Sequence, residues 1–157
     1  MNNPNGLFQT FTVNHLLSSK GRTVWHVRPH ETVFAALQLM AAKNVGAVVV
    51  IDEDKLTGIL SERDYARKVT LLGKSSKTTP VYEIMTTKVV TVGPDHTIGE
   101  CMEKMTFHRI RHLPVVDGDR VIGLISIGDL VKAFIMQQAF FLEQLENYRG
   151  GKHGVAP

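Results

Sequence analysis

Cysteine is nearly absent from this sequence of 157 residues, in which Cys101 is the single one. An intramolecular disulfide and a zinc module built from several cysteines are therefore excluded, and we expect a reducing compartment, the cytoplasm. Long hydrophobic runs are also missing, because the strongly apolar segment 46–51 is far shorter than the roughly 20 residues that span a bilayer. Residues 1–12 lack the cationic and apolar regions of a secretory signal, so we expect neither secretion nor membrane insertion.

The sequence also contains little proline, and neither sign of charge is in large excess. The 6 prolines and 13 glycines exclude collagen-like and low-complexity chains, and 43% hydrophobic with 21% charged residues is typical of an ordinary globular protein. The 18 Lys and Arg residues only slightly exceed the 15 Asp and Glu residues, for a net charge of +3. This balance permits anionic ligands but is weak grounds for nucleic-acid binding. The length suits one domain or two small halves that share a core.

The chain consists of two copies of one unit. An ungapped alignment that places Pro29 on Pro94 pairs residues 24–69 with residues 89–134. The identical pairs are Val24/Val89, Val27/Val92, Pro29/Pro94, Thr32/Thr97, Met40/Met105, Val50/Val115, Asp52/Asp117, Asp54/Asp119, Gly58/Gly123, Ser61/Ser126 and Asp64/Asp129. Most other pairs exchange one aliphatic residue for another. We therefore expect two similar units that pack on each other about a pseudo-two-fold axis.

Each unit is expected to contain a strand, a helix, two strands and a closing helix, in a mixed α+β or α/β architecture. In the first copy, residues 24–27 form a short β-rich run that Pro29 ends. Glu31 or Thr32 then begins a helix, in which apolar side chains recur at the i, i+3, i+4 and i+7 positions of an amphipathic helix.

A hairpin and the closing helix complete each unit. Residues 47–51 and 55–60 are two β-rich runs, and the acidic segment 52–54 between them predicts a hairpin turn. The closing helices begin at Ser61 in the first copy and at Ser126 in the second.

Shorter segments surround these units. Helical lead-ins are expected at 13–17 and 81–85, and the last helix continues past the repeat with apolar side chains that need a partner. The predicted divisions are an arm at 1–12, a first unit at 13–70, a linker at 71–80, a second unit at 81–135, a helical extension at 136–148 and a disordered tail at 149–157.

The start of each closing helix allows two interpretations. Residues 58–64 and 123–129 both contain Gly, two aliphatic residues, Ser, two variable residues and Asp. Ser followed three residues later by an acid is close to a capping box, which satisfies N–H groups at the helix start. The same N–H groups and the positive helix end also suit a phosphate, and an Asp there can accept both hydroxyls of a ribose. Both interpretations stay open.

Two arginines lie next to the first of these acids. Arg63 and Arg67 share one face of the first closing helix beside Asp64, where their guanidinium groups either bind phosphate oxygens or are simply solvated. The second copy has Gly128 and Lys132 at the equivalent positions, so any second phosphate site should be weaker or shaped for another ligand.

The densest cationic stretch is residues 108–112, which forms either a solvated turn or a cationic wall for an anionic ligand. We expect no metal there, because His108 and His112 would need one continuous helix, whereas the helix should end near His108. No nucleophile elbow, phosphate-binding loop or dinucleotide fingerprint is present. Cys101 lies on an apolar stripe and is interpreted as a core residue, so no catalytic residue is expected.

The tandem unit resembles the CBS domain, named for cystathionine β-synthase, in its usual paired form. The resemblance rests on the double Gly-h-h-Ser-x-x-Asp motif and on the Arg-His-Leu-Pro-Val-Val-Asp segment at 111–117, and it covers about residues 13–135. It implies a free-standing pair of β-α-β-β-α units with two clefts, commonly a homodimer. It also implies non-enzymatic, regulatory binding of an adenosine-containing ligand: AMP first, or ADP, ATP, NAD or S-adenosylmethionine.

The resemblance also implies two ligand sites. The first contains Ser61, Arg63, Asp64, Arg67, Thr91, Ile110, Arg111, His112 and Leu113. The second contains Ser126, Gly128, Asp129, Lys132, His26, Val27, Val45, Gly46 and Ala47. In each, the Asp would bind ribose hydroxyls and the Ser would help hold phosphate. Because the second site lacks a cationic wall, we expect the first to prefer a phosphorylated ligand and the second to be weaker, roomier or vacant.

Two other functions remain open. Arg63, Arg67, Arg109 and Arg111 could bind nucleic-acid phosphates, although the charge balance disfavours this. Alternatively, the chain is a structural dimer whose contact is the C-terminal helix at 127–145. If the chain is a regulatory ligand-binding module, as the resemblance implies, we expect an unknown downstream protein to bind it differently with and without ligand.

Overall fold

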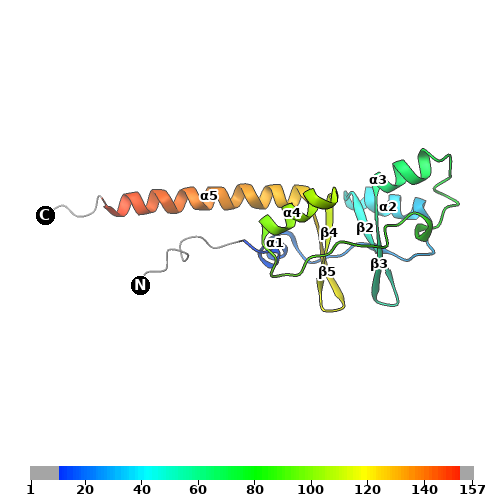
Figure 1. The fold of residues 1–157 in the computed structure, drawn as a ribbon, viewed down its shortest axis with the longest axis horizontal. Helices are drawn as coiled ribbons and strands as arrows, with labels where there is room; N and C mark the ends of the chain where they lie inside the picture. Colours follow the sequence, from blue (N-terminus) through cyan, green and yellow to red (C-terminus); the bar gives the residue numbers. More distant parts are fainter. Residues whose placement is uncertain (1–10, 153–157) are drawn as a thin grey trace.

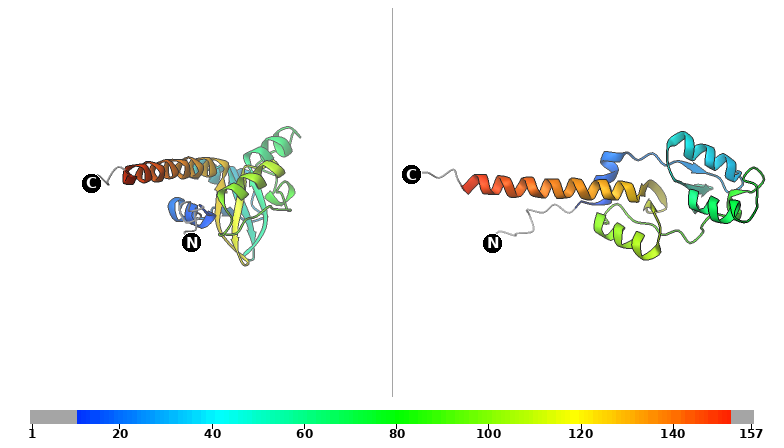
Figure 2. Two further views of the ribbon diagram at one scale, coloured as in Figure 1. Left: turned by 60° about the vertical axis from the view of Figure 1, so that its left-hand side comes forward. Right: turned by 90° about the horizontal axis from the view of Figure 1, so that it is seen from above.

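Two β-hairpins lie side by side near the centre of the molecule, one from each repeat (Figure 1, Figure 2). The computed structural model describes residues 11–152. The elements are α1 (Val13–Lys20), β1 (His26–Val27), α2 (Val33–Lys43), β2 (Ala47–Asp52), β3 (Lys55–Ser61), α3 (Glu62–Tyr65), the π-turn η2 (Ala66–Thr70), the 3-10 turn η3 (Val81–Glu83), α4 (Ile98–His108), β4 (His112–Asp117), β5 (Arg120–Ser126) and α5 (Ile127–Lys152). The expected mixed architecture of two similar units is confirmed.

The first long helix of each unit begins and ends with the same type of cap. Thr32 and Thr97 each accept a hydrogen bond from the backbone N–H three residues further on, at 3.1 and 3.0 Å. At the other end, Asn44 and Arg109 adopt left-handed φ angles of 53° and 54° and so end α2 and α4. The helix start predicted at Thr32 is therefore confirmed.

The two sheets differ by one strand. In the first unit β1 pairs parallel with β2, and β2 pairs antiparallel with β3, whereas the second unit contains only the antiparallel pair β4 and β5. The first strand expected in the second copy is reduced to a single bridge between Val92 and Val115. The expectation of three strands in each unit is therefore wrong for the second.

Proline explains this difference. In the first unit the N–H of Val49 donates to the carbonyl of Trp25 at 3.3 Å. The residue equivalent to Val49 is Pro114, which has no N–H to donate to Val90, the equivalent of Trp25. The second ladder loses this hydrogen bond and shrinks to the bridge at Val92.

The lead-in segments pack on the opposite units. Val13, Leu16 and Leu17 of α1 belong to the hydrophobic core of the second unit. Val81 and Ile84, in and after η3, belong to the core of the first. The predicted divisions 13–70 and 81–135 therefore cut across the packing, because each unit borrows its lead-in from the other half of the chain.

Two equivalent glycines receive these exchanged segments. A Cβ on Gly123 would lie 2.6 Å from Cδ2 of Leu17, and a Cβ on Gly58 would lie 2.6 Å from Sδ of Met85. Both glycines are needed for this close approach. Each lead-in segment thus packs on the opposite unit in the same way, and the two contacts are related by the pseudo-two-fold axis.

Helix α5 begins in the second core and then projects away from both units (Figure 1). Leu130 in its first turns is fully buried, whereas most large apolar side chains further along are exposed. The helix continues to Lys152, so the disorder expected from residue 149 is wrong for 149–152, and 153–157 lie outside the described residues, as do 1–10 of the expected arm. Between residues 11 and 152, no helix is both long and apolar enough to cross a membrane.

Candidate ligand-binding clefts

A cavity of about 300 Å³ lies where the first unit meets the second. Its walls come from β3 and α3, from the extended segment 86–90, and from the residues that lead into β4. The lining residues are Gly46, Ile59, Ser61, Glu62, Arg63, Asp64, Thr86, Lys88, Val89, Val90, Ile110, Arg111 and His112. The structure thus brings together the predicted residues Ser61, Arg63, Asp64, Ile110, Arg111 and His112. We call this space the Asp64 cavity.

Asp64 is held by the cap of its own helix. Its Oδ2 accepts hydrogen bonds from the N–H of Ser61 at 2.9 Å and from the Ser61 hydroxyl at 3.0 Å, while its own N–H donates to Ser61 Oγ. Its Oδ1 is 3.1 Å from Nζ of Lys68, one turn along. The capping-box interpretation is confirmed, and the cap holds the carboxylate in a fixed position on the cavity wall.

Cationic side chains from both units line the same space. Arg63 donates from Nη1 to the carbonyl of Arg109 at 3.0 Å, so its guanidinium group links the start of α3 to the end of α4. Arg111 approaches from the second unit and Lys88 from the extended segment. These three cations outnumber the two carboxylates in the lining, Glu62 and Asp64, so the cavity can accept an anionic group beside the cations.

The cationic surroundings and burial change the pKa of the His112 side chain. Burial lowers the pKa of its imidazole, and the charges of Lys20, Arg111 and Arg63 lower the pKa further, against the opposing effect of Asp129. His112 therefore remains neutral where an exposed histidine would begin to take up a proton, and an anion bound in the cavity would reverse part of this shift.

Three residues predicted for this site are not part of the cavity lining. Leu113 is fully buried in the second core, Arg67 is exposed on η2, and Thr91 uses its carbonyl to accept a hydrogen bond from Lys104 at 3.1 Å. None of them is among the lining residues of the cavity. Arg67 is near the motif in sequence, and the resemblance assigned Thr91 and Leu113 to the same site, but neither indicates which way each side chain points.

Sequence reasoning missed the segment just before Thr91. Thr86, Lys88 and Val89 line the cavity, and so does Gly46, which had been assigned to the other site. A signal for Lys88 exists, because residues 81–88 match residues 13–20 when the lead-ins are aligned separately from the repeat.

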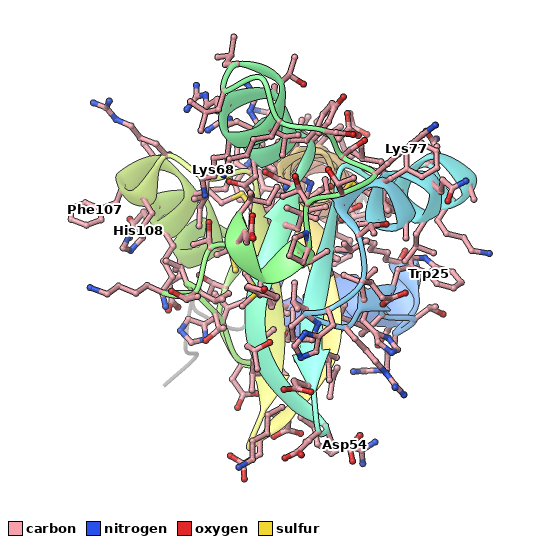
Figure 3. The ribbon with its side chains drawn as sticks, turned by 90° about the vertical axis from the view of Figure 1, so that its right-hand side faces the viewer. Trp25, Asp54, Lys68, Lys77, Phe107 and His108 are labelled. Atoms are coloured by element: carbon pink, nitrogen blue, oxygen red, sulfur yellow. The ribbon has the colours of Figure 1, made fainter. Side chains whose placement is uncertain are left out.

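The histidines near β4 do not form a pair. His108 ends α4 and His112 begins β4, and the His108 ring lies on the outer surface beside Phe107, with ring centroids 5.0 Å apart (Figure 3). Within residues 11–152, no cluster of three His, Cys, Asp or Glu side chains has the geometry of a metal site.

The residues predicted for the second site differ in their exposure to solvent. Val27 and Ala47 are buried, Val45 packs against the first core, and His26 is exposed. Gly128 and Lys132 line a separate hollow of about 600 Å³ at the start of α5, together with Arg111, Ile127, Val131, Ile135 and Met136. Ser126 hydrogen-bonds to Asp129, and Gly128 and Lys132 lie beside Asp129 in the first turns of α5.

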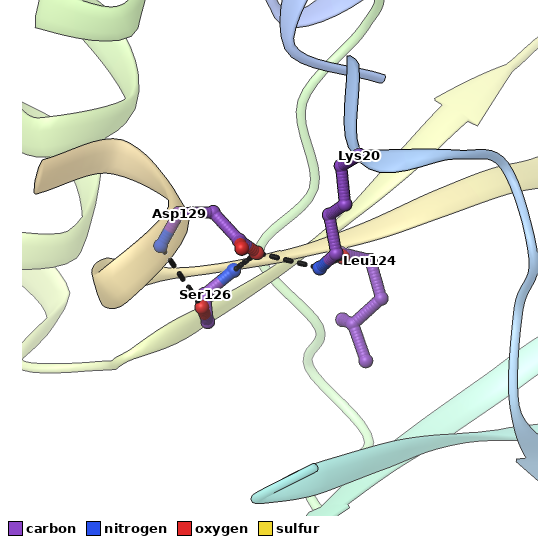
Figure 4. A network of polar contacts seen from close by, with 4 residues as sticks. All are labelled: Lys20, Leu124, Ser126 and Asp129. Carbon is purple, nitrogen blue, oxygen red and sulfur yellow. Dashed lines mark hydrogen bonds and ion pairs between the residues drawn. The ribbon is translucent and has the colours of Figure 1, made fainter. Parts of the chain in front are cut away.

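The Asp129 carboxylate forms an ion pair with Lys20, which comes from a distant segment of the chain (Figure 4). Nζ of Lys20 lies 2.5 Å from Oδ2 of Asp129 and 2.6 Å from the carbonyl oxygen of Leu124. The same Oδ2 accepts the N–H of Ser126 at 2.8 Å. Although burial alone would raise the pKa of the Asp129 carboxyl, its hydrogen bonds with Lys20 and Ser126 lower it overall.

Comparison with known proteins identifies the architecture. A model of the CBS domain matches residues 21–70 and 81–136. The CBS domain-containing protein CBSX3, mitochondrial, of Arabidopsis thaliana is 38% identical over 154 residues, which cover 92% of this chain and 74% of that protein.

Two solved structures show the same arrangement. The CBS domain structure NE2398 is 52% identical and superposes with a TM-score of 0.78, covering 81% of this chain and 99% of that one. The CBS domain pair of protein MJ0100, solved with 5′-methylthioadenosine and S-adenosyl-L-methionine, is 26% identical, with a TM-score of 0.70 over 80% of this chain and 97% of that one. With its two matched segments and their shared fold, this chain belongs to the CBS domain family as a CBS domain pair.

Proposed function

We propose that this CBS pair is a regulatory module that binds an adenosine-containing ligand in the Asp64 cavity. The observation that carries the proposal is the lining itself, in which a capped carboxylate from the first unit faces Arg111 and His112 from the second. A ligand there contacts both units, and β3 and β5 also contact each other across this boundary. Binding would bias their relative packing, typically by about 1–3 kcal/mol of coupling, and so change the surface shown to a downstream protein.

The cavity favours a small, anionic member of this ligand class. Its volume of about 300 Å³ is at the lower end of the range for small-molecule sites, which suits a mononucleotide better than NAD. The cationic wall suits a phosphate better than the positively charged sulfonium of S-adenosylmethionine. AMP is therefore our leading ligand, with ADP and ATP next, and the adenosine compounds held by MJ0100 support the class.

The proposed role is binding without catalysis, in the cytoplasm. Burial, together with the nearby Glu100, raises the pKa of the Cys101 thiol to about 11, so this side chain is a poor nucleophile at neutral pH. A free, buried thiol also agrees with the reducing compartment expected from the single cysteine.

We also propose that two copies pair through α5. The outer part of the helix projects from the body (Figure 2), and Val131, Ile135, Leu142 and Leu145 are 43–61% exposed. Together with Gln138 they alternate spacings of four and three residues, the heptad pattern of a coiled coil. The occupant we propose is a second copy of α5, because identical stripes complement each other about a two-fold axis.

Calorimetric titration of the full chain with AMP, ADP, ATP, NAD and S-adenosylmethionine tests the ligand proposal. We expect AMP to bind and Asp64→Asn to abolish or strongly weaken this binding, because the amide keeps an acceptor for the Ser61 N–H but loses one carboxylate acceptor and its charge. Asp54→Asn is the matched control, since Asp54 lies at the tip of the β2–β3 hairpin (Figure 3). Wild-type affinity in Asp64→Asn would overturn the site assignment, and binding of none of the five compounds would overturn the sensor proposal.

A further inference from the structure

Arg111 lies between two hollows of the molecule. It lines the Asp64 cavity, and it also lines the hollow of about 600 Å³ at the start of α5. Of the residues that the structure describes, Arg111 is the one that these two linings share. A molecule that binds in one of the two spaces can therefore affect the other through this residue.

The backbone of Arg111 is attached to α5. Its carbonyl accepts a hydrogen bond from the N–H of Ile127, the first residue of the helix, at 2.9 Å. The first unit contains the same contact, in which the carbonyl of Gly46 accepts the N–H of Glu62 at 3.0 Å. Gly46 and Arg111 are equivalent positions of the repeat. The backbone contact thus belongs to the fold of both units, and the second unit adds an arginine side chain to it.

The side chain of Arg111 is exposed and is not held in either space. Among residues 11–152, its guanidinium group has no hydrogen-bond or ion-pair partner. Arg63, in contrast, donates to the carbonyl of Arg109 and lines only the Asp64 cavity. Lys132 lines only the hollow at α5. Arg111 is therefore the cation that can turn toward an anion in the cavity and leave the hollow.

The hollow at α5 is the first part of the helix face that we propose as the pairing surface. Val131 and Ile135 line the hollow, and they are also the first two residues of the heptad stripe, 46% and 61% exposed. The cations of this otherwise apolar lining are Arg111 and Lys132. A second copy of α5 that covers the hollow removes Arg111 from water, which is unfavourable for a cation without a partner.

We propose that Arg111 couples ligand binding in the Asp64 cavity to pairing through α5. The inference rests on the proposed ligand binding and the proposed pairing, and it adds the regulation that joins them. A phosphate in the cavity gives the guanidinium group a charged partner and draws it away from the hollow. The second copy of α5 then covers a less cationic surface. An anionic ligand therefore strengthens pairing, and pairing in turn strengthens the binding of that ligand.

Sedimentation of the full chain without ligand, with saturating AMP and with saturating adenosine tests this inference. We expect AMP to lower the dissociation constant of the dimer about tenfold, and adenosine, which has no phosphate, to change it little. Arg111→Met should pair more tightly than the wild type without ligand, because the hollow has lost a cation. AMP should then no longer change the dissociation constant of this variant. The measurement without ligand remains informative even if Arg111→Met binds AMP weakly.

Two cations that line only one of the spaces provide matched controls. Arg63→Met removes a cation from the cavity and should weaken AMP binding, whereas Lys132→Met removes a cation from the hollow and should tighten pairing without ligand. At saturating AMP both variants should keep the tenfold effect of AMP on pairing, because both retain Arg111.

Calorimetry of the wild type supplies the reciprocal measurement. AMP should bind about threefold more tightly at protein concentrations well above the dissociation constant of the dimer than well below it, because two sites share the tenfold effect on the dimer. Equal AMP affinity at both concentrations would contradict the coupling.

Different results would overturn different parts. If AMP binds to a wild-type dimer without changing its dissociation constant, the coupling is wrong and both proposed functions stand. An AMP effect that persists in Arg111→Met, or one that is lost equally in Arg63→Met and Lys132→Met, would overturn the role of Arg111. An equal effect of adenosine would overturn the role of the phosphate. If AMP does not bind, or if the wild type does not pair, the corresponding proposed function fails and the coupling fails with it.

Discussion

The imidazole ring of His112 lies against the backbone of Gly46, across the boundary between the two units. Its Nε2 atom is 3.4 Å from the position that a Cβ on Gly46 would occupy. The resemblance to the CBS pair implied different sites for these two residues, yet both line the Asp64 cavity. This contact helps to shield the ring from water, and burial is the main cause of its lowered pKa.

The stability of the protein should therefore depend on the charge of His112. Because the pKa of His112 is lower in the folded chain than the ordinary value of 6.5, the unfolded chain takes up the proton first as pH falls. The contribution of neutral His112 to the free energy of unfolding is therefore complete above pH 6.5. It is lost progressively as the pH falls from 6.5 to the pKa of His112 in the folded chain. Urea unfolding between about pH 5 and pH 8 should show a steeper loss for the wild type than for His112→Gln. Parallel pH profiles for the two proteins would contradict this assignment.

The two glycines that receive the lead-ins should not tolerate a methyl group. Gly123→Ala brings its Cβ against the buried Leu17, and Gly58→Ala meets both Met85 and the backbone carbonyl of Thr86. We expect each to lower the free energy of unfolding by about 1–3 kcal/mol, with Gly58→Ala the more costly because backbone yields less readily.

A helical glycine offers the control for this pair. The nearest atom to a Cβ on Gly99, in α4, is 3.8 Å away. Gly99→Ala should therefore stabilise the protein by roughly 0.5–1 kcal/mol, since alanine is the better helix former. Similar losses at all three positions in urea unfolding would contradict the importance of the exchanged packing.

The Cys101 thiol should report on unfolding. It is fully buried, and its pKa of about 11 leaves very little thiolate at neutral pH. Reaction with a disulfide reagent should be slow in the native protein and fast in urea, with an unfolding midpoint matching that from circular dichroism. Rapid labelling under native conditions would show that the second core opens readily.

Charges placed on the stripe of α5 should separate the proposed dimer. The double variant Ile135→Asp with Leu142→Asp puts two carboxylates at positions that alternate with Val131 and Leu145 in the heptad. Sedimentation should show a dimer for the wild type and a monomer for the double variant. Gln144→Asp, on the same helix but off the stripe, should remain dimeric. A wild-type monomer, or a dimer that survives the double substitution, would overturn pairing through α5.

The sequence by itself determined the features that depend on near neighbours. The caps at Thr32 and Thr97 and the capping box of Ser61 and Asp64 each involve a side chain and the backbone three residues away, so a short motif is enough to predict them. The repeat also predicted both hairpins and the start of each closing helix. The resemblance to the CBS pair predicted part of the Asp64 cavity, because it implied that residues 110–112 lie opposite the first motif.

The tertiary structure alone decided which segment packs where. The ion pair of Lys20 with Asp129 joins residues far apart in the sequence, and it forms because α1 packs on the second unit. Pro114 is visible in the sequence, but its effect on the strand at Val92 depends on the register that sets it beside that segment. Two copies with nearly the same motif thus acquire different cationic partners, because Lys68 follows Asp64 by four residues in the sequence, whereas the packing of α1 on the second unit brings Lys20 to Asp129.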